Sequence, residues 1–229
     1  MKQAQTVGEL LRRRLEETRK SPEELAEAAQ VPPAYIDELL DGTRRPPLPG
    51  RTDVYDKMTR FLRLARNELA ACASAERAAA GERPALPDAK IRRLLFSLCD
   101  PHTATELERR ARAKGGAAEF ADFIQRLLDV THGAVQRMLN DPLVLRAAAT
   151  QHGSSFTAVR LRVLEFLDKT PATLTAADVE EFIRPRVTHW EVDFETGVLR
   201  VVLRGQEARD RDRRVPSRAH PGPAPDLAD

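Results

Sequence analysis

The sequence predicts a mostly α-helical protein, with an N-terminal helical bundle followed by a helical domain that ends in a β-hairpin. Three observations support this class. Apolar residues recur at helical spacing from residue 7 to residue 183. The apolar period then changes to two, at Trp190, Val192 and Phe194, as expected of a strand. Aromatic residues make up only 5% of the chain, so the cores must rest mainly on Leu, Val, Ile and Ala.

The N-terminal bundle is expected to begin with a helix over residues 7–19, because Val7, Leu10, Leu11 and Leu15 fall on one face. Ser21 marks the start of the next helix. A Ser followed three residues later by Glu24 forms a capping box, and Pro22 suits the first helical position. This helix is interrupted at residues 30–32.

A further short helix is expected from Pro33 to Leu40, closed by Asp41-Gly42. Residues 44–50 then read as an extended loop, because three prolines in four positions cannot continue a helix. A longer helix is expected over residues 53–72, which completes an N-terminal domain of residues 1–72. Residues 73–88, punctuated by Gly and Pro, are expected to be a linker.

The second domain is expected to span residues 89–204. Its helices are predicted near residues 91–98, 105–112, 120–128, 135–139, 142–150, 156–167 and 175–183. Two strands joined by the turn Glu195-Thr196-Gly197 follow. A lone hairpin is marginally stable, so this one must pack on the helices or pair with a partner chain. Residues 205–229 have almost no apolar side chains and are expected to be a disordered tail.

Composition excludes several classes. The 37 Lys and Arg nearly balance the 35 Asp and Glu, and a net charge of +2 excludes nucleic-acid binding through bulk charge. Cys72 and Cys99 are too few for a disulfide scaffold or a zinc site, and are expected to be small buried residues in a reducing cytosol. No apolar run approaches the length of a membrane span, so the expected location is the cytoplasm, without membrane attachment.

Catalytic and metal-binding motifs are not found in the sequence. None of the five histidines has the spacing of a metal site, and Gly115-Gly116 lacks the Lys-Ser/Thr that follows in a phosphate-binding loop. We therefore expect no enzyme activity, no catalytic or metal-binding residue and no cofactor.

Residues 21–42 have the spacing of a helix-turn-helix, with Val31 facing inward between two short helices. Together with its flanking helices, the stretch TVGELLRRRLEETRKSPEELAEAAQVPPAYIDELLDGTRRPP resembles the Cro-repressor or XRE family of helix-turn-helix domains, over residues 6–70. The resemblance implies that the helix Pro33–Leu40 lies in the DNA major groove. It implies groove contacts from Pro33, Ala34, Tyr35, Asp37 and Glu38, and phosphate contacts from Arg12, Arg44, Arg45 and Arg51.

Two features depart from that family. Gln30 occupies the turn position where the family commonly has Gly, and Gln tolerates the left-handed conformation less well. Residues 21–41 hold six acidic side chains and no Lys or Arg, which opposes approach to a polyanion. Residues 42–66, by contrast, hold seven Lys or Arg against two Asp. This basic segment either grips phosphates beside the groove or forms an ordinary solvated face.

A second helix-turn-helix is an alternative for residues 120–141. Residues 124–141 align with 25–42 without gaps, and matching positions are apolar in both. The second stretch would place polar side chains at a groove, namely Thr131, His132, Gln136, Arg137 and Asn140. The other interpretation is two consecutive core helices.

The sequence is compatible with two functions. The first is a bacterial transcriptional regulator that binds double-stranded DNA as a homodimer, with residues 89–204 dimerising or sensing a signal. The second is an adaptor that uses an acidic, degenerate helix-turn-helix to dock a basic protein partner. The acidic segment 21–41 discriminates between them.

Overall fold

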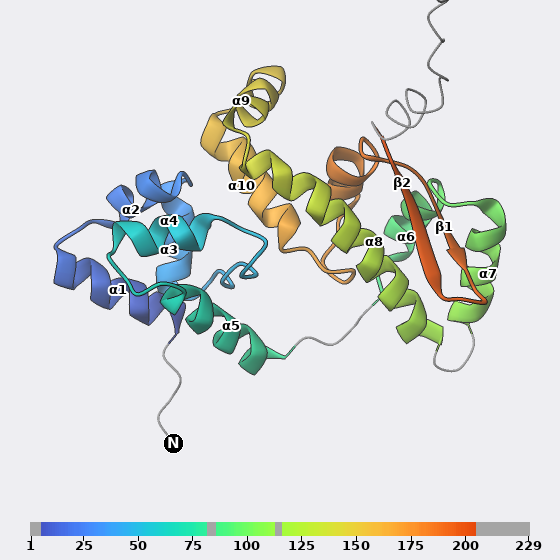
Figure 1. Ribbon diagram of the computed structural model, residues 1–229, viewed down its shortest axis with the longest axis horizontal. Helices are drawn as coiled ribbons and strands as arrows, with labels where there is room; N and C mark the ends of the chain where they lie inside the picture. The colour runs from blue at the N-terminus through green and yellow to red at the C-terminus, as the bar shows by residue number, and fades with distance from the viewer. Residues whose placement is uncertain (1–5, 82–85, 113–115, 205–229) are drawn as a thin grey trace, which may run out of the picture.

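A computed structural model describes residues 6–81, 86–112 and 116–204. The chain is mostly helical, with an N-terminal helix-turn-helix and a C-terminal antiparallel hairpin, which confirms the predicted class. Figure 1 shows the N-terminal helices on one side and the long helix α8 crossing the centre of the molecule. We call residues 6–81 the N-terminal unit and the described residues from 86 to 204 the C-terminal unit.

Five helices make up the N-terminal unit. They are α1 (Val7–Thr18), α2 (Pro22–Ala29), α3 (Pro33–Asp41), α4 (Val54–Phe61) and α5 (Glu68–Ala80). The predicted capping box is present, because the Ser21 hydroxyl accepts from the Glu24 N–H and the Glu24 carboxylate accepts from the Ser21 N–H. Residues 44–50 form no helix, as expected, and Gly42 ends α3 in the left-handed conformation at φ 74°.

The single helix predicted over residues 53–72 is wrong. The chain leaves the helix after Phe61, and Arg63 and Asn67 adopt positive φ values of 52° and 65°. Lys20, which follows α1, holds this corner, because its Nζ donates to the Phe61 carbonyl at 2.7 Å and thereby satisfies a carbonyl at the end of α4. The following helix α5 then runs to Ala80, into the segment expected to be a linker.

The C-terminal unit is built on α8. Its elements are α6 (Ala89–Phe96), α7 (Pro101–Ala111), α8 (Gly116–Leu139), α9 (Pro142–Gln151), α10 (Phe156–Leu167), α11 (Ala176–Asp178), a π-helix η1 (Val179–Ile183), β1 (Val187–Asp193) and β2 (Val198–Leu203). The alternative of a second helix-turn-helix at residues 120–141 is wrong, because α8 is one continuous helix of 24 residues through this stretch. The expected tail 205–229 lies outside the described residues.

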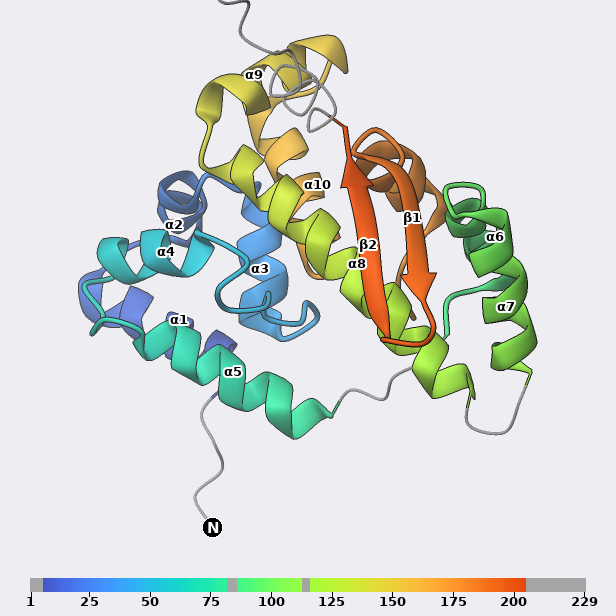
Figure 2. The same cartoon turned by 45° about the vertical axis from the view of Figure 1, so that its right-hand side comes forward.

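The hairpin packs on the helices of its own unit, which resolves the alternative left open by the sequence. Strands β1 and β2 pair antiparallel, with Trp190 opposite Val201. Figure 2 shows the hairpin against α8, with α6 and α7 on its other side. Trp190 is fully buried and its indole N–H donates to the Leu95 carbonyl at 2.9 Å, so the tryptophan fixes β1 to α6.

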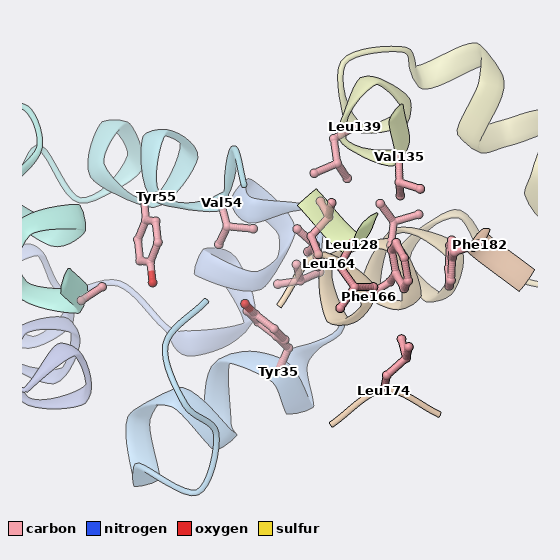
Figure 3. Packing of buried hydrophobic residues seen from close by; sticks show 14 of the residues in the cluster. Tyr35, Val54, Tyr55, Leu128, Val135, Leu139, Leu164, Phe166, Leu174 and Phe182 are labelled. Carbon is pink, nitrogen blue, oxygen red and sulfur yellow. The ribbon is translucent and has the colours of Figure 1, made fainter. Parts of the chain in front are cut away.

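Both units contribute to one continuous apolar core. Figure 3 shows buried side chains that pack between the two units: Tyr55, Val54 and Tyr35 of the N-terminal unit, and Leu164, Leu128 and Phe166 of the C-terminal unit. Close packing of this kind is the arrangement of a protein interior. The position of the N-terminal unit on the C-terminal unit is therefore set by burial as well as by polar contacts.

Two further expectations can be compared with the fold. Cys72 and Cys99 form no disulfide with each other, and Cys72 is half-buried rather than buried as expected. Cys99 is buried, and burial raises the pKa of its thiol to about 12. Across the described ranges of the chain, we find no helix that is long and apolar enough to cross a membrane.

Candidate nucleic-acid interface

The turn between α2 and α3 has the form that the sequence predicted. Gln30 takes the left-handed conformation at φ 59°, and the Val31 N–H donates back to the Ala26 carbonyl at 3.0 Å. Pro32 is the N-cap of α3 and Pro33 its first residue, where a missing N–H costs no hydrogen bond. The Gln30 side chain accepts from Lys57 Nζ at 2.6 Å, which ties the turn to α4.

Helix α1 fixes α3 from behind. A β-carbon on Gly8 would lie 2.7 Å from the carbonyl oxygens of Leu39 and Leu40, so the close approach of the two helices requires glycine. The Arg12 guanidinium donates to the Leu40 carbonyl at 3.1 Å, and the rest of this predicted phosphate ligand remains exposed. These contacts leave the opposite side of α3 open.

The open side of α3 carries Pro33, Ala34, Asp37 and Asp41, which are all exposed. Three of these were predicted to reach the groove. Tyr35 was also predicted there, but it is 3% exposed and belongs to the core, so this prediction is wrong. Burial raises the pKa of the Tyr35 hydroxyl, as expected of a phenol inside the fold.

Arg44 is held between the two units. Its Nε donates to Glu38 Oε2 at 2.6 Å, and its Nη2 donates to Glu165 Oε1 on α10 at 3.1 Å. The guanidinium also lies over the Tyr35 ring, 4.8 Å from its centroid. A predicted phosphate ligand and the predicted base-contacting Glu38 are thus engaged with each other in this structure.

Arg51 is engaged in the same way on α8. It donates to Asp129 Oδ1 at 2.5 Å and to His132 Nδ1 at 2.7 Å. Since arginine only donates, Nδ1 of His132 must accept, and the imidazole is neutral with its proton on Nε2. Burial, and then the charge of Arg51, lower the pKa of His132 to about 4.

The second predicted set of DNA ligands is mostly unavailable. Thr131 is fully buried and His132 is 2% exposed, so neither can meet DNA, and these two predictions are wrong. Gln136 donates to the Gly50 carbonyl at 2.8 Å and supports the loop after α3. Arg137 on α8 and Asn140 directly after it are exposed, but α8 is continuous, so no helix-turn-helix turn presents them to DNA.

Further ion pairs join the units at residues that the sequence did not single out. Asp168, at the end of α10, accepts from Arg77 at 2.6 Å and from the Leu48 N–H at 3.1 Å. Burial raises the pKa of Asp168, although the charge of Arg77 opposes this. Asp53 pairs with Arg160, which is 1% exposed. In the sequence, these ion pairs are visible only as carboxylates and arginines beside apolar residues, and this pattern does not show which carboxylate pairs with which arginine.

Basic side chains remain exposed around the N-terminal unit. Arg45 lies at the edge of a cavity of about 750 Å³ between the units, which Glu165 and Lys169 also line. At the corner between α4 and α5, Arg60, Arg63 and Arg66 surround a shallow hollow, and all three are exposed. Among the residues that the structure describes, no cluster of three His, Cys, Asp or Glu side chains is arranged to hold a metal ion.

Comparison with known proteins identifies one part of the chain. Residues 6–72 match the model of a family described as a helix-turn-helix domain, which confirms a helix-turn-helix domain over the stretch in which the resemblance was seen. No curated protein and no solved structure matches the chain. The helix-turn-helix domain thus coincides with α1 to α4 and the first turn of α5, and the C-terminal unit has no assigned family.

Proposed function

We propose that the chain is a transcriptional regulator whose helix-turn-helix domain binds double-stranded DNA through α3. The observation that carries this proposal is the uncovered outer side of α3, with Pro33, Ala34, Asp37 and Asp41 exposed while the C-terminal unit packs elsewhere. In helix-turn-helix domains the second helix enters the major groove with its N-terminal residues on base edges. The small side chains at the start of α3 allow such close approach.

The base contacts follow from these side chains. Pro33 and Ala34 offer apolar surfaces suited to a thymine methyl group, and the Asp37 carboxylate accepts from a cytosine amino group. Phosphate contacts are assigned to exposed cations, above all Arg12 and Arg45. Arg44 and Arg51 can contact phosphates only if they break their hydrogen bonds to Glu165 and Asp129, respectively. These contacts with the C-terminal unit therefore lower the affinity for DNA.

A homodimer completes the proposal. One helix-turn-helix reads a single half-site, and two copies related by a two-fold axis read both halves of a palindrome. The C-terminal unit is the part that is free to dimerise or to receive a signal, because it adds a separate set of helices beyond the matched residues 6–72.

Fluorescence anisotropy on a labelled duplex of random sequence, titrated at several salt concentrations, tests DNA binding by the full chain. Arg45→Ala should weaken binding for all sequences alike and reduce the slope of log affinity against log salt by about 1. Arg93→Ala, at an exposed arginine of α6, is the matched control and should change neither. Absence of binding to any duplex at low salt would refute the proposal.

The acidic surface favours a second candidate, an adaptor that docks a basic protein. Glu23, Glu24 and Glu27 on α2 are in the same acidic segment as Asp37 and Asp41, and residues 21–41 contain no Lys or Arg. The double change Asp37→Asn and Asp41→Asn separates the two functions. It should raise the non-specific affinity for DNA if α3 meets phosphates. It should instead abolish capture of an arginine-rich peptide if the acidic side is a docking surface.

A further inference from the structure

A half-open cavity of about 790 Å³ lies in the C-terminal unit, away from α3. It is enclosed by the end of α8, by α9 and α10, and by the π-helix η1, and Figure 2 shows α9 over α10 at this end of the molecule. Its wall is mainly apolar, with Met138, Val144, Ala148, Val159, Val163 and Phe182. Its volume falls within the roughly 300–1,000 Å³ typical of small-molecule sites.

Arg186 supplies a positive charge at this apolar wall. Its guanidinium donates to the Phe182 carbonyl at 3.0 Å, to the Glu181 carbonyl at 3.3 Å and to the Met138 sulfur at 2.8 Å. All three acceptors are neutral, and within the described part of the chain no carboxylate forms an ion pair with Arg186. Burial lowers the pKa of Arg186, because the charged guanidinium is poorly solvated, although the charge of Glu181 opposes this.

The two acidic side chains near Arg186 are already engaged. Glu181 accepts from Arg162. Both carboxylate oxygens of Glu180 accept from Nη1 of Arg184, each at 3.0 Å. A charge that is partly buried without a counter-ion is costly, and an anion that reaches it gains a charge-assisted hydrogen bond. The cavity therefore combines an apolar volume with one arginine that forms no ion pair with a described carboxylate.

The backbone that forms this wall departs from an α-helix. In η1 the Arg184 N–H donates to the Val179 carbonyl at 2.8 Å, which is the wider π-type turn that often occurs at functional sites. One face of Phe182 stacks on Phe166 with ring centroids 4.5 Å apart, and Figure 3 shows the two rings side by side. This stacking holds the Phe182 side chain in place, where it lines the cavity.

From these observations we infer that the cavity binds a small amphipathic carboxylic acid, with its carboxylate on Arg186 and its hydrocarbon part between α9, α10 and η1. This binding does not depend on the DNA-binding proposal. Only its role as the signal of a regulator rests on that proposal.

Isothermal titration calorimetry on the full chain tests the site with octanoate and with octanamide, its neutral equivalent. A hydrogen bond to a charged group stabilises by about 1.5–3 kcal/mol, so octanoate should bind at least tenfold more tightly than octanamide, one molecule per chain. Arg186→Met removes the charge and keeps an unbranched side chain. This variant should bind the two probes alike.

Two further variants make the result decisive. Arg184→Met removes an exposed arginine two residues away and should keep the preference for octanoate. Ala148→Phe fills the cavity and should abolish binding of both probes, so the site remains testable even if Arg186→Met fails to fold. Equal binding of both probes to the unaltered chain would overturn the inference. The inference would also be overturned if octanoate does not bind and the chain instead forms a dimer that buries the exposed Leu143 and Val144 of α9.

Discussion

Residues 25–42 and 124–141 share one pattern of apolar residues and fold differently. The first stretch breaks after Ala29, where Gln30 is left-handed and two prolines stop α2 and begin α3. The second has Thr131 and His132 in place of the two prolines and stays within α8. The apolar period places the buried faces of a helix, whereas the residues at the turn decide whether the helix ends.

The polar sides of the two stretches differ as well. On α3, Pro33, Ala34 and Asp37 are exposed. On α8, His132 and Gln136 lie on one face and both contact the loop that follows α3, at Arg51 and Gly50. The same pattern therefore builds an outward surface in one place and an internal joint in the other, and this joint holds the helix-turn-helix domain in position.

The strongest test of this comparison transfers the turn residue of the first stretch to the second. Thr131→Pro removes an N–H from the interior of α8 and places a ring against the Leu127 carbonyl, which should lower the free energy of unfolding by about 3 kcal/mol or more. Urea unfolding followed by far-UV circular dichroism measures the change.

Thr131→Val is the matched control. It keeps the size of the side chain and loses the hydrogen bond from Thr131 Oγ1 to the Leu127 carbonyl, for an expected cost of about 1 kcal/mol. If the proline and valine variants unfold at the same urea concentration, then the absence of proline at residues 131 and 132 is not what keeps α8 continuous.

The comparison also explains how far the sequence predicts this fold. Helix α2, its capping box, α3 and the hairpin follow from local signals, since each depends on residues within a few positions of one another. The corner after Phe61 does not, because it is held by Lys20, which follows α1 and lies about forty residues earlier.

The candidate site shows the same division. The exposure of Pro33, Ala34 and Asp37 follows from the helical period of α3. The burial of Tyr35 and the pairing of Arg44 with Glu165 depend on how α10 packs on the N-terminal unit, and no local pattern encodes that contact. Long-range ion pairs of this kind become visible only once the two units are placed together.

A second test uses the joint on α8. His132 has a folded-state pKa of about 4 against an ordinary value of 6.5, so the unfolded chain binds more protons between these values. Stability should therefore fall as the pH drops through this window, by about 2 kcal/mol between pH 7 and pH 5. Arg51 and Asp129 are the charged groups that face His132 across this joint.

His132→Gln should remove this part of the pH dependence. The loss of stability between pH 7 and pH 5 should be about 2 kcal/mol smaller in the variant, whatever its stability at pH 7. His102→Gln, at an exposed histidine of α7, should keep the pH dependence of the unaltered chain. An unchanged pH profile in His132→Gln would show that the imidazole is not held neutral by the joint.

The smallest expected effect lies at the turn of the first stretch. Gln30 adopts a conformation that costs a residue with a β-carbon about 1–2 kcal/mol, and glycine adopts it without that cost. Gln30→Gly also loses the hydrogen bond from Lys57 and increases the conformational entropy of the unfolded chain. We therefore compare it with Gln30→Ala, which loses the same hydrogen bond. The glycine variant should be more stable than the alanine variant by about 1 kcal/mol in urea unfolding. Equal stabilities would mean that the two prolines, without the left-handed residue before them, are sufficient to separate α2 from α3.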